Sequence, residues 1–319
     1  MVQSDAIRPQ RTALGVGLIL GSVLLMAFAD AVVKRVSADL TVWQIFAARS
    51  LFAIPIVYVL LKLARIGLRV RAPVWAILRS VLLVLTWLAF YASLPVLDLS
   101  VAAVAVYSNP IITALLSALL IGEPVTGRRW AGVFLGFVGV VVILRPGSDS
   151  FSWFVLLPLL AAFLYSLAMV ITRDKCQHEA PLTLALVLQI AFVVTGVLAT
   201  ALLAVIDLPA GWAAAYPFLF ADRGVLGLEG MGMRDWAVMA VLGGLSVAYF
   251  VGVARAYQVA EPSVVAVFDY AYLISAAFWG FVFFAERPDV LTVAGMVLIT
   301  AAGLTVAAPR PRRRAGNGS

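Results

Sequence analysis

One passage of this chain occurs twice. Residues 98–144 align with residues 261–307 without a gap, at a constant offset of 163 positions. Eleven of the 47 aligned pairs are identical, including Tyr107 with Tyr270. Both copies are long and hydrophobic enough to cross a bilayer. The repeat therefore predicts a duplicated bundle of membrane helices, an arrangement that typically holds a solute site where the two copies meet.

The composition places the chain in a membrane. Hydrophobic residues make up 64% of the 319 positions and charged residues 12%, whereas soluble domains average about 45–50% and about 25%. The single cysteine, Cys176, excludes an internal disulfide, and the single histidine, His178, argues against a zinc site or histidine-based catalysis. The net charge of +7 falls mostly in predicted short loops and in the tail. We interpret it as a topology signal and predict no nucleic-acid partner.

Ten segments reach or approach the length of about 20 mostly apolar residues that a transmembrane helix needs. The first, which starts at Ala13, is too long for the core of a cleavable signal peptide. We predict an all-α membrane protein in which residues 1–150 form the first five-helix repeat, residues 151–308 the second, and residues 309–319 a basic cytoplasmic tail. The predicted spans are 13–34, 42–63, 74–95, 99–121, 130–145, 151–172, 182–206, 236–257, 263–285 and 290–308.

The basic residues set the predicted orientation of the bundle. With ten spans and both termini inside, the inner loops and tails hold fourteen lysines and arginines and the outer loops hold six, which agrees with the positive-inside rule. The repeat offset covers five helices, an odd number, so the second copy is expected to enter the membrane upside down. Glu123 is then expected in an inner loop and its counterpart Glu286 in an outer loop. Inverted repeats give a bundle two near-equivalent shapes, which alternating access requires.

Several stretches follow the pattern of a known carrier fold. They are the region from YSNP to RPG at 107–147, the region that contains AERPD at 255–304, Arg49 within FAARSLFA, and the first-span region 27–44. Together they resemble the EamA family of the drug/metabolite transporter superfamily. The resemblance implies a ten-helix inner-membrane carrier with a central cavity and no bound cofactor, for solutes that range over amino acids, nucleosides, sugars, vitamins and drugs. The stretch RAYQVAEPSVVAVFDY is most similar to a branch that includes S-adenosylmethionine uptake carriers.

Each ionisable residue inside a predicted span needs an explanation, because it costs about 2.5–3.5 kcal/mol on insertion scales. Asp269 is the deepest acid. One interpretation is a cavity carboxylate, which attracts a cationic or zwitterionic solute or binds a proton. The alternative is a permanent ion pair with Arg255 or Arg79. Arg49 stands about seven residues into the second span. It either contacts an anionic group of the solute or clamps Asp30 or backbone carbonyls.

Two further sets of charges lie near the ends of predicted spans. Asp30 and Lys34 are four residues apart near the outer end of the first span, so they share one helix face. They form either an intrahelical pair or part of an outer gate. Arg79 and Arg255 lie near the inner ends of their spans, where their side chains either snorkel to the interface or pair with Asp269.

Six aromatic residues fall at predicted mid-depth, where a Tyr or Trp that faces lipid is unusual because its polar edge needs a partner. Some of them are expected to line a cavity and to stack on a planar solute or hold a cation; the alternative for each is ordinary helix packing. Pro110 removes a helix hydrogen bond, so Asn109 is expected beside a bend that either borders the site or is a structural kink. The six residues are Trp87, Tyr91, Tyr107, Tyr249, Tyr270 and Trp279.

We predict a secondary transporter that moves a small cationic, zwitterionic or aromatic metabolite across the bacterial cytoplasmic membrane by alternating access. The alternatives are an exporter of amino acids or toxic metabolites, a channel, or a membrane-embedded enzyme. No HExxH, GxSxG or clustered metal-ligand motif is present, so no catalytic residue, metal or cofactor is predicted. The expected partners are the solute and membrane lipid; proton or counter-solute coupling and a monomer or homodimer stay open. The predicted solute-binding residues are Arg49, Trp87, Tyr91, Tyr107, Asn109, Tyr249, Asp269, Tyr270 and Trp279, and the predicted gating or ion-pair residues are Asp30, Lys34, Arg79 and Arg255.

Overall fold

The computed structural model describes residues 11–122, 126–144, 152–206, 211–222, 224, 228–287 and 289–307. All regular secondary structure in this part is helical. Glu123 and the predicted tail lie outside the described residues. The elements are α1 (Thr12–Val36), α2 (Val42–Leu63), α3 (Pro73–Ser93), α4 (Leu99–Val106), α5 (Asn109–Ile121), α6 (Gly127–Leu144), η1 (Trp153–Val155), α7 (Leu156–Asp174), α8 (Pro181–Leu203), α9 (Trp212–Ala215), α10 (Pro217–Phe220), α11 (Met233–Val259), α12 (Pro262–Phe268), α13 (Ala271–Phe284) and α14 (Val290–Ala307).

Seven helical stretches of the described chain are long and apolar enough to cross a membrane. Shorter apolar helices occur at Asn109–Ile121, Trp130–Val142 and Val290–Ala302. A described helix coincides with each of the ten segments that the sequence predicts as spans. The prediction of an all-helical membrane protein is therefore confirmed.

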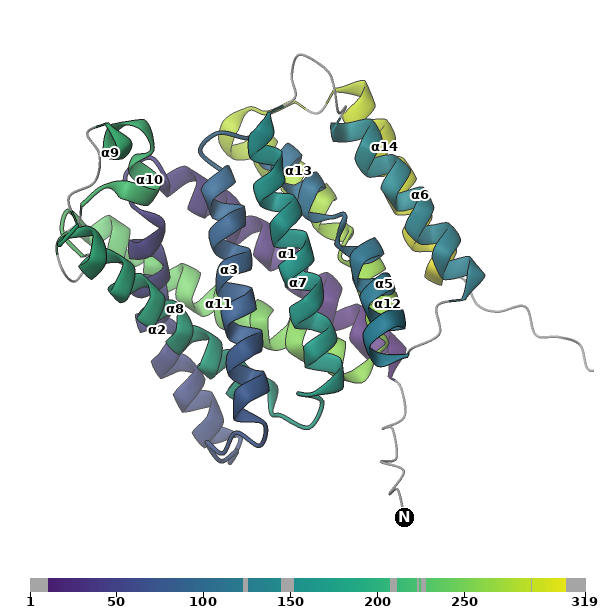
Figure 1. Ribbon diagram of the computed structural model, residues 1–319, viewed down its shortest axis with the longest axis horizontal. Helices are drawn as coiled ribbons and strands as arrows, with labels where there is room; N and C mark the ends of the chain where they lie inside the picture. The colour runs from purple at the N-terminus through teal and green to yellow at the C-terminus, as the bar shows by residue number, and fades with distance from the viewer. Residues whose placement is uncertain are drawn as a thin grey trace, which may run out of the picture.

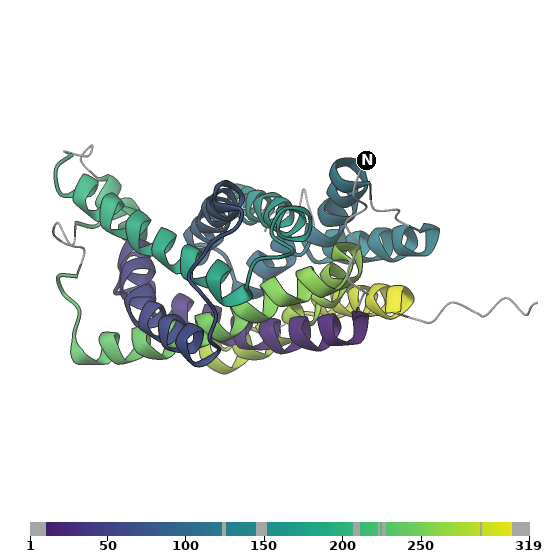
Figure 2. The same ribbon diagram turned by 90° about the horizontal axis from the view of Figure 1, so that it is seen from below.

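The helices are arranged in two layers. Figure 2 shows α3, α5, α6 and α7, coloured blue to teal, on one side, and α1, α11, α13 and α14, coloured purple, green and yellow, on the other. Within the second layer α1 packs on α11 and α13, and within the first α7 packs on α3 and α5. At one edge of the bundle α2 packs on α8, and at the other α6 packs on α14 (Figure 1). Each layer therefore contains helices from both the first five and the last five predicted spans.

Two of the predicted spans are interrupted near their middle. The fourth is divided into α4 and α5 by a turn at Tyr107 and Ser108, and the ninth into α12 and α13 by a turn at Asp269 and Tyr270. The helices that follow the two turns also end alike. The residue that caps α5, Gly122, has φ 64°, and the residue that caps α13, Ala285, has φ 55°, so both adopt the left-handed conformation. The bend expected near Pro110 is confirmed, whereas nothing in the sequence analysis predicted the second interruption.

Helix α2 is fixed firmly against its neighbours. It begins with a capping box, in which the Thr41 hydroxyl accepts from the Gln44 N–H and the Gln44 side chain accepts from the Thr41 N–H. Gly196 of α8 and Gly243 of α11 lie against α2; a Cβ at Gly243 would come within 2.8 Å of the Arg49 carbonyl oxygen. Because small residues let helix backbones approach closely in a membrane, these contacts set the position of Arg49.

The region predicted as a long loop contains the two short helices α9 and α10, next to one end of α2 and α3. The Trp43 indole N–H donates to the Leu219 carbonyl oxygen at 2.8 Å, and the Gln44 amide donates to the Glu229 carbonyl oxygen at 3.0 Å. The Tyr216 hydroxyl donates to a carbonyl at the end of α3. These bonds tie the connection to the beginning of α2 and the end of α3.

Candidate functional site

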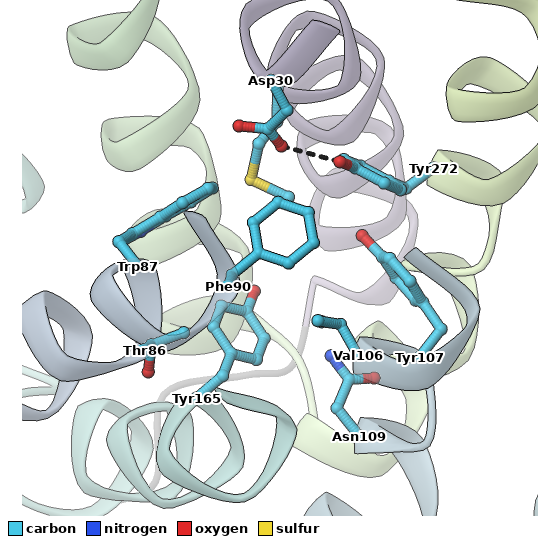
Figure 3. A pocket seen from close by; sticks show the side chains of 10 residues that line it. Asp30, Thr86, Trp87, Phe90, Val106, Tyr107, Asn109, Tyr165 and Tyr272 are labelled. Carbon is cyan, nitrogen blue, oxygen red and sulfur yellow. Dashed lines mark hydrogen bonds between the residues drawn. The ribbon is translucent and has the colours of Figure 1, made fainter. Parts of the chain in front are cut away.

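A small cavity lies between the two layers (Figure 3). Its volume is about 30 Å³, and its walls come from α1, α3, α7, α13 and the interrupted fourth span. Half of the lining side chains are aromatic, and one carboxylate, that of Asp30, is among the lining groups. The lining residues are Met26, Asp30, Thr86, Trp87, Phe90, Val106, Tyr107, Asn109, Tyr165 and Tyr272.

Asp30 is fully buried and is held by two tyrosines from different helices. The Tyr272 hydroxyl of α13 donates to one carboxylate oxygen at 2.7 Å, and the Tyr91 hydroxyl of α3 donates to the other at 3.1 Å. Figure 3 shows the first of these bonds at the upper edge of the cavity. Because a buried carboxylate is stable only when it is hydrogen-bonded or protonated, the two hydroxyls keep Asp30 at the junction of the two layers.

Arg49 is connected to Asp30 through Tyr91. One terminal guanidinium nitrogen of Arg49 donates to the Tyr91 hydroxyl oxygen at 3.3 Å. The guanidinium carbon lies 4.7 Å from the centre of the Phe192 ring, a cation–π contact. The Nε and Nη2 atoms are buried and have no hydrogen-bond partner within the described chain. The predicted link between Arg49 and Asp30 is thus present, through a tyrosine, and two of the guanidinium nitrogens are left without an acceptor.

Asp269 is also buried, but it lies in the turn between α12 and α13 and is not among the cavity-lining residues. The Tyr257 hydroxyl donates to its Oδ2 at 2.8 Å, and Oδ1 has no partner among the described residues. The Tyr257 ring packs edge-on against the ring of Tyr165 at 6.4 Å, and Tyr165 lines the cavity. Asp269 is therefore separated from the cavity by a layer of tyrosine rings.

The alternative of a permanent ion pair for Asp269 is not realised in the described structure. The Arg79 Nε atom donates to the Thr172 hydroxyl at 2.7 Å, and its Nη1 atom is buried without a partner in that part of the chain. Arg255 is half-buried and lines a separate cleft at one end of the bundle. Neither guanidinium forms a salt bridge with Asp269. Asp269 is therefore paired with neither Arg79 nor Arg255.

Two of the six predicted aromatic residues line the cavity and four do not. Trp87 and Tyr107 line the cavity, as does the predicted Asn109, whose side-chain oxygen has no partner among the described residues. Tyr107 stacks on Tyr272 with ring centres 4.9 Å apart. The remaining predicted aromatics do not line the cavity. Tyr91 and Tyr249 adjoin the Trp87 ring, Tyr270 lies next to Tyr107, and Trp279 packs on Phe28 between α1 and α13.

Lys34 has a different partner from the one that its spacing predicts. Its ammonium group donates to the Glu286 carboxylate at 2.8 Å and to the Leu97 carbonyl oxygen at 3.0 Å. Both side chains of this ion pair are 14% exposed. The intrahelical pair of Asp30 with Lys34 is therefore wrong, because Asp30 points inward to two tyrosines while Lys34 reaches across to the end of α13. Glu286, expected from the sequence only as a loop residue, thus links α1 to the end of α13.

The predicted site residues do not include three tyrosines of this site or one polar network. Tyr165, Tyr257 and Tyr272 each contact a cavity wall or a buried carboxylate. Tyr272 had a usable signal, because it stands 163 residues after Asn109, its counterpart in the repeat. The network is the pair of bonds from the Ser50 hydroxyl to the Gln189 oxygen and from the Gln189 nitrogen to the Ser246 hydroxyl, at 2.7 and 2.8 Å. It joins α2, α8 and α11 next to Arg49.

Known proteins similar to this chain are membrane transporters. The EamA-like transporter family matches residues 13–145. The chain is 26% identical to the pseudopaline exporter CntI of Pseudomonas aeruginosa strain UCBPP-PA14, over 90% of this chain and 94% of that protein. It is 24% identical to the S-adenosylmethionine uptake transporter of Rickettsia bellii, over 92% and 93%, and 33% identical to the riboflavin transporter of Rhizobium johnstonii, over 46% and 48%. One solved crystal structure superposes with a TM-score of 0.69 over 92% of this chain and 97% of that one, at 17% identity; this likeness concerns the fold alone.

Proposed function

Since the chain belongs to the EamA-like transporter family, we propose that it is a secondary transporter that works by alternating access. The proposed solute is a small metabolite that combines a cationic or zwitterionic group with a planar ring. The observation that carries this proposal is the shared cavity of a buried carboxylate, Asp30, and the rings of Trp87, Tyr107 and Tyr272. A membrane enzyme is excluded by the transporter family.

The chemistry of the cavity supports this class of solute. The Asp30 carboxylate supplies a negative charge, and aromatic faces attract a nearby cation by about 0.5–2 kcal/mol. The guanidinium of Arg49, one tyrosine away, has two nitrogens without a partner among the described residues, and these would bind the carboxylate of a zwitterion. S-adenosylmethionine and riboflavin, the solutes named for two of the relatives, both contain planar heteroaromatic rings. Asp269 would add a second negative charge to the site when the rings of Tyr257 and Tyr165 move apart during the proposed cycle.

An inverted repeat explains the packing of the ten spans. If the first five spans correspond in order to the second five, the pair α1–α11 corresponds to α7–α3, and α1–α13 to α7–α5; all four pairs are packed together. The self-corresponding pairs α2–α8 and α6–α14 are packed as well. The two interrupted spans stand at the same place in both halves. We therefore assign residues 1–150 and 151–308 to the two repeats.

The cavity must enlarge during the proposed cycle. A volume of about 30 Å³ holds about one water molecule, whereas pockets for drug-sized ligands measure about 300–1,000 Å³. The structure is thus a closed conformation. At one end α1 of the first half is joined to the end of α13 of the second half by Lys34 and Glu286, and near the other end α3 of the first half is joined to α7 of the second by Arg79 and Thr172. In the proposed cycle the Lys34–Glu286 pair breaks to open that end.

The proposed orientation rests on the distribution of basic residues, which places both termini in the cytoplasm. The end with Lys34 and Glu286 would then face away from the cytoplasm. The similar proteins come from bacteria and include both exporters and uptake transporters. We accordingly propose a location in the bacterial cytoplasmic membrane and assign no direction of net flux.

The test of the proposed function is counterflow in liposomes that contain the purified protein. Vesicles are loaded with unlabelled S-adenosylmethionine, riboflavin or an amino acid, and uptake of the same labelled compound is followed. We expect saturable counterflow of at least one compound that carries both a ring and a positive charge. Asp30→Asn should reduce it by about tenfold or more, because a hydrogen bond to a charged group contributes about 1.5–3 kcal/mol.

Asp39→Asn is the matched control, since Asp39 is an exposed acid in the connection after α1 and should leave counterflow unchanged. Counterflow by the Asp30→Asn protein at the wild-type rate, with wild-type affinity, would contradict the assignment of the cavity as the solute site. Linear, non-saturating flux would contradict the carrier mechanism itself.

A further inference from the structure

A second and larger recess lies at the end of the bundle opposite Lys34 and Glu286. It is a cleft of about 720 Å³ between the α2–α3 connection, the α7–α8 connection and the last turns of α11. In Figure 1 these segments meet at the lower edge of the molecule. None of the residues that line it lines the cavity described above. Its charged and polar lining residues include Arg69, Arg71, His178, Glu179, Thr183 and Arg255.

The arginines of this cleft form no salt bridge within the described chain. Arg69 and Arg71 are exposed and Arg255 is half-buried. The nearby acid, Glu179, is engaged with the backbone. Its Oε1 atom accepts the N–H groups of Arg71 and the next residue at 2.7 and 2.6 Å. Glu179 therefore shapes the loop that carries two of the arginines, and three positive charges face one recess.

The beginning of α8 adds hydrogen-bond donors to the same recess. Pro181 is the first residue of this 23-residue helix, and the first bond of its backbone ladder runs from the Leu184 N–H to the Ala180 carbonyl. The N–H groups before Leu184 are free of that ladder, as at the start of any helix. Thr183 is only 2% exposed and lines the cleft, and its hydroxyl has no hydrogen-bond partner in the described structure. A helix start with a buried, unpartnered hydroxyl is suited to bind an anion.

We propose that this cleft is a binding site for a phosphate group. The phosphate would accept from the start of α8 and from the Thr183 hydroxyl and would pair with Arg255, while Arg69 and Arg71 close over it from the opposite side. Arginine is well suited to this role because its planar fork binds phosphate oxygens in pairs. The phosphate belongs either to the headgroup of an anionic phospholipid or to a free anion in solution.

The position of the cleft gives the bound group a structural role. Arg69 and Arg71 belong to the connection between two helices of the first half, whereas Thr183 and Arg255 belong to the second half. A phosphate that binds all of them links the halves at this end. Its expected effect is to favour conformations in which this end is closed.

The experiment measures binding of two probes to the whole protein. Inorganic phosphate is titrated into the detergent-solubilised chain, and in parallel the chain is placed in phosphatidylcholine nanodiscs with and without phosphatidylglycerol. The thermal unfolding midpoint and the apparent Kd are recorded. The variants are Arg255→Gln alone and the double variant Arg69→Gln/Arg255→Gln. Arg35→Gln, an exposed arginine at the opposite end, is the matched control.

We expect phosphate, phosphatidylglycerol or both to raise the unfolding midpoint of the wild type and of Arg35→Gln. The double variant should bind at least about tenfold more weakly, because charged hydrogen bonds are lost. A response to phosphatidylglycerol alone identifies a lipid headgroup, and a response to phosphate identifies a free anion. If Arg255→Gln does not fold, the exposed Arg71→Gln replaces it. Equal stabilisation by phosphatidylcholine, no response to either probe, or unchanged affinity in the double variant would overturn the proposal.

Discussion

The two interrupted spans share a backbone design but differ in chemistry. Both divide within one residue of the same position in the repeat, and both end in a left-handed residue. The side chains around the two breaks are different. Val106, Tyr107 and Asn109 surround the first, and their counterparts at the second are Asp269, Tyr270 and Tyr272. The backbone break is therefore common to both copies, whereas only the second copy has a carboxylate at the break.

The same asymmetry extends to the second span of each half. The second span of the first half, α2, carries the buried Arg49, while the second span of the other half, α8, carries the neutral Gln189. Gln189 is hydrogen-bonded on both sides by Ser50 and Ser246, whereas Arg49 keeps two nitrogens unpartnered in the described chain. One half thus supplies an unsatisfied cation and the other supplies an unsatisfied carboxylate oxygen, on Asp269. In the proposed repeat, the backbone pattern is thus shared by the two halves, whereas the unpartnered buried charges in the described chain differ between them.

The largest expected effect comes from removing the charge of the second break. Asp269→Asn should lower counterflow by about tenfold or more, because the acceptor of the Tyr257 bond loses its charge and such bonds contribute about 1.5–3 kcal/mol. The unfolding midpoint serves as the folding control. The matched change at the first break, Val106→Asn, adds an amide without removing a charge and should have the smaller effect. Equal losses in both variants would mean that the breaks do not differ in chemical role.

The ion pair that follows the second break should have an intermediate effect. Lys34→Gln, Glu286→Gln and the double variant form a mutant cycle whose coupling in unfolding free energy we expect to be about 1 kcal/mol, the upper range for pairs open to water. The value is modest because both side chains are 14% exposed. Both single variants should also open this end of the bundle more readily. A coupling of zero would remove the pair from the proposed closure.

The proline of the first break should matter less than the charges do. Pro110→Ala restores one backbone N–H, but the second break exists without a proline at the corresponding Leu273. We therefore expect the unfolding free energy to change by less than about 1 kcal/mol and counterflow to persist. Denaturant unfolding and the counterflow assay measure both quantities. Complete loss of transport would show that the two breaks are maintained by different forces.

The smallest expected effect concerns Cys176, in the connection after α7. Its side chain is fully buried, and burial raises the pKa of the thiol to about 11. The reactive thiolate is therefore scarce at neutral pH and increases as the pH rises toward that value. Maleimide labelling of the native protein should be slow at pH 7 and faster at pH 9. Rapid labelling at pH 7 would indicate that this end of the bundle opens in solution.

Much of the helical frame follows from hydropathy, but the partners of the buried charges do not. The helices at all ten predicted spans were predictable because each helix must satisfy its own backbone in lipid, and that requirement is local. The partner of Lys34 was not, since Glu286 lies 252 residues away and only the packing of α1 on α13 brings it close. The break at Asp269 was missed because it contains neither proline nor glycine. The repeat could have indicated this second break, because Asp269 and Tyr270 correspond to positions beside the break that Pro110 predicts.

The inverted arrangement of the two halves is tested most directly by the sidedness of two equivalent positions. Gly127 begins α6 and Val290, 163 residues later, begins α14; both are exposed. Gly127→Cys and Val290→Cys are labelled in intact cells and in inverted vesicles with a membrane-impermeant maleimide, with the native chain as the background control. We predict that Cys at 127 reacts only from the cytoplasmic side and Cys at 290 only from the opposite side. Labelling of both from the same side would contradict the inverted repeat.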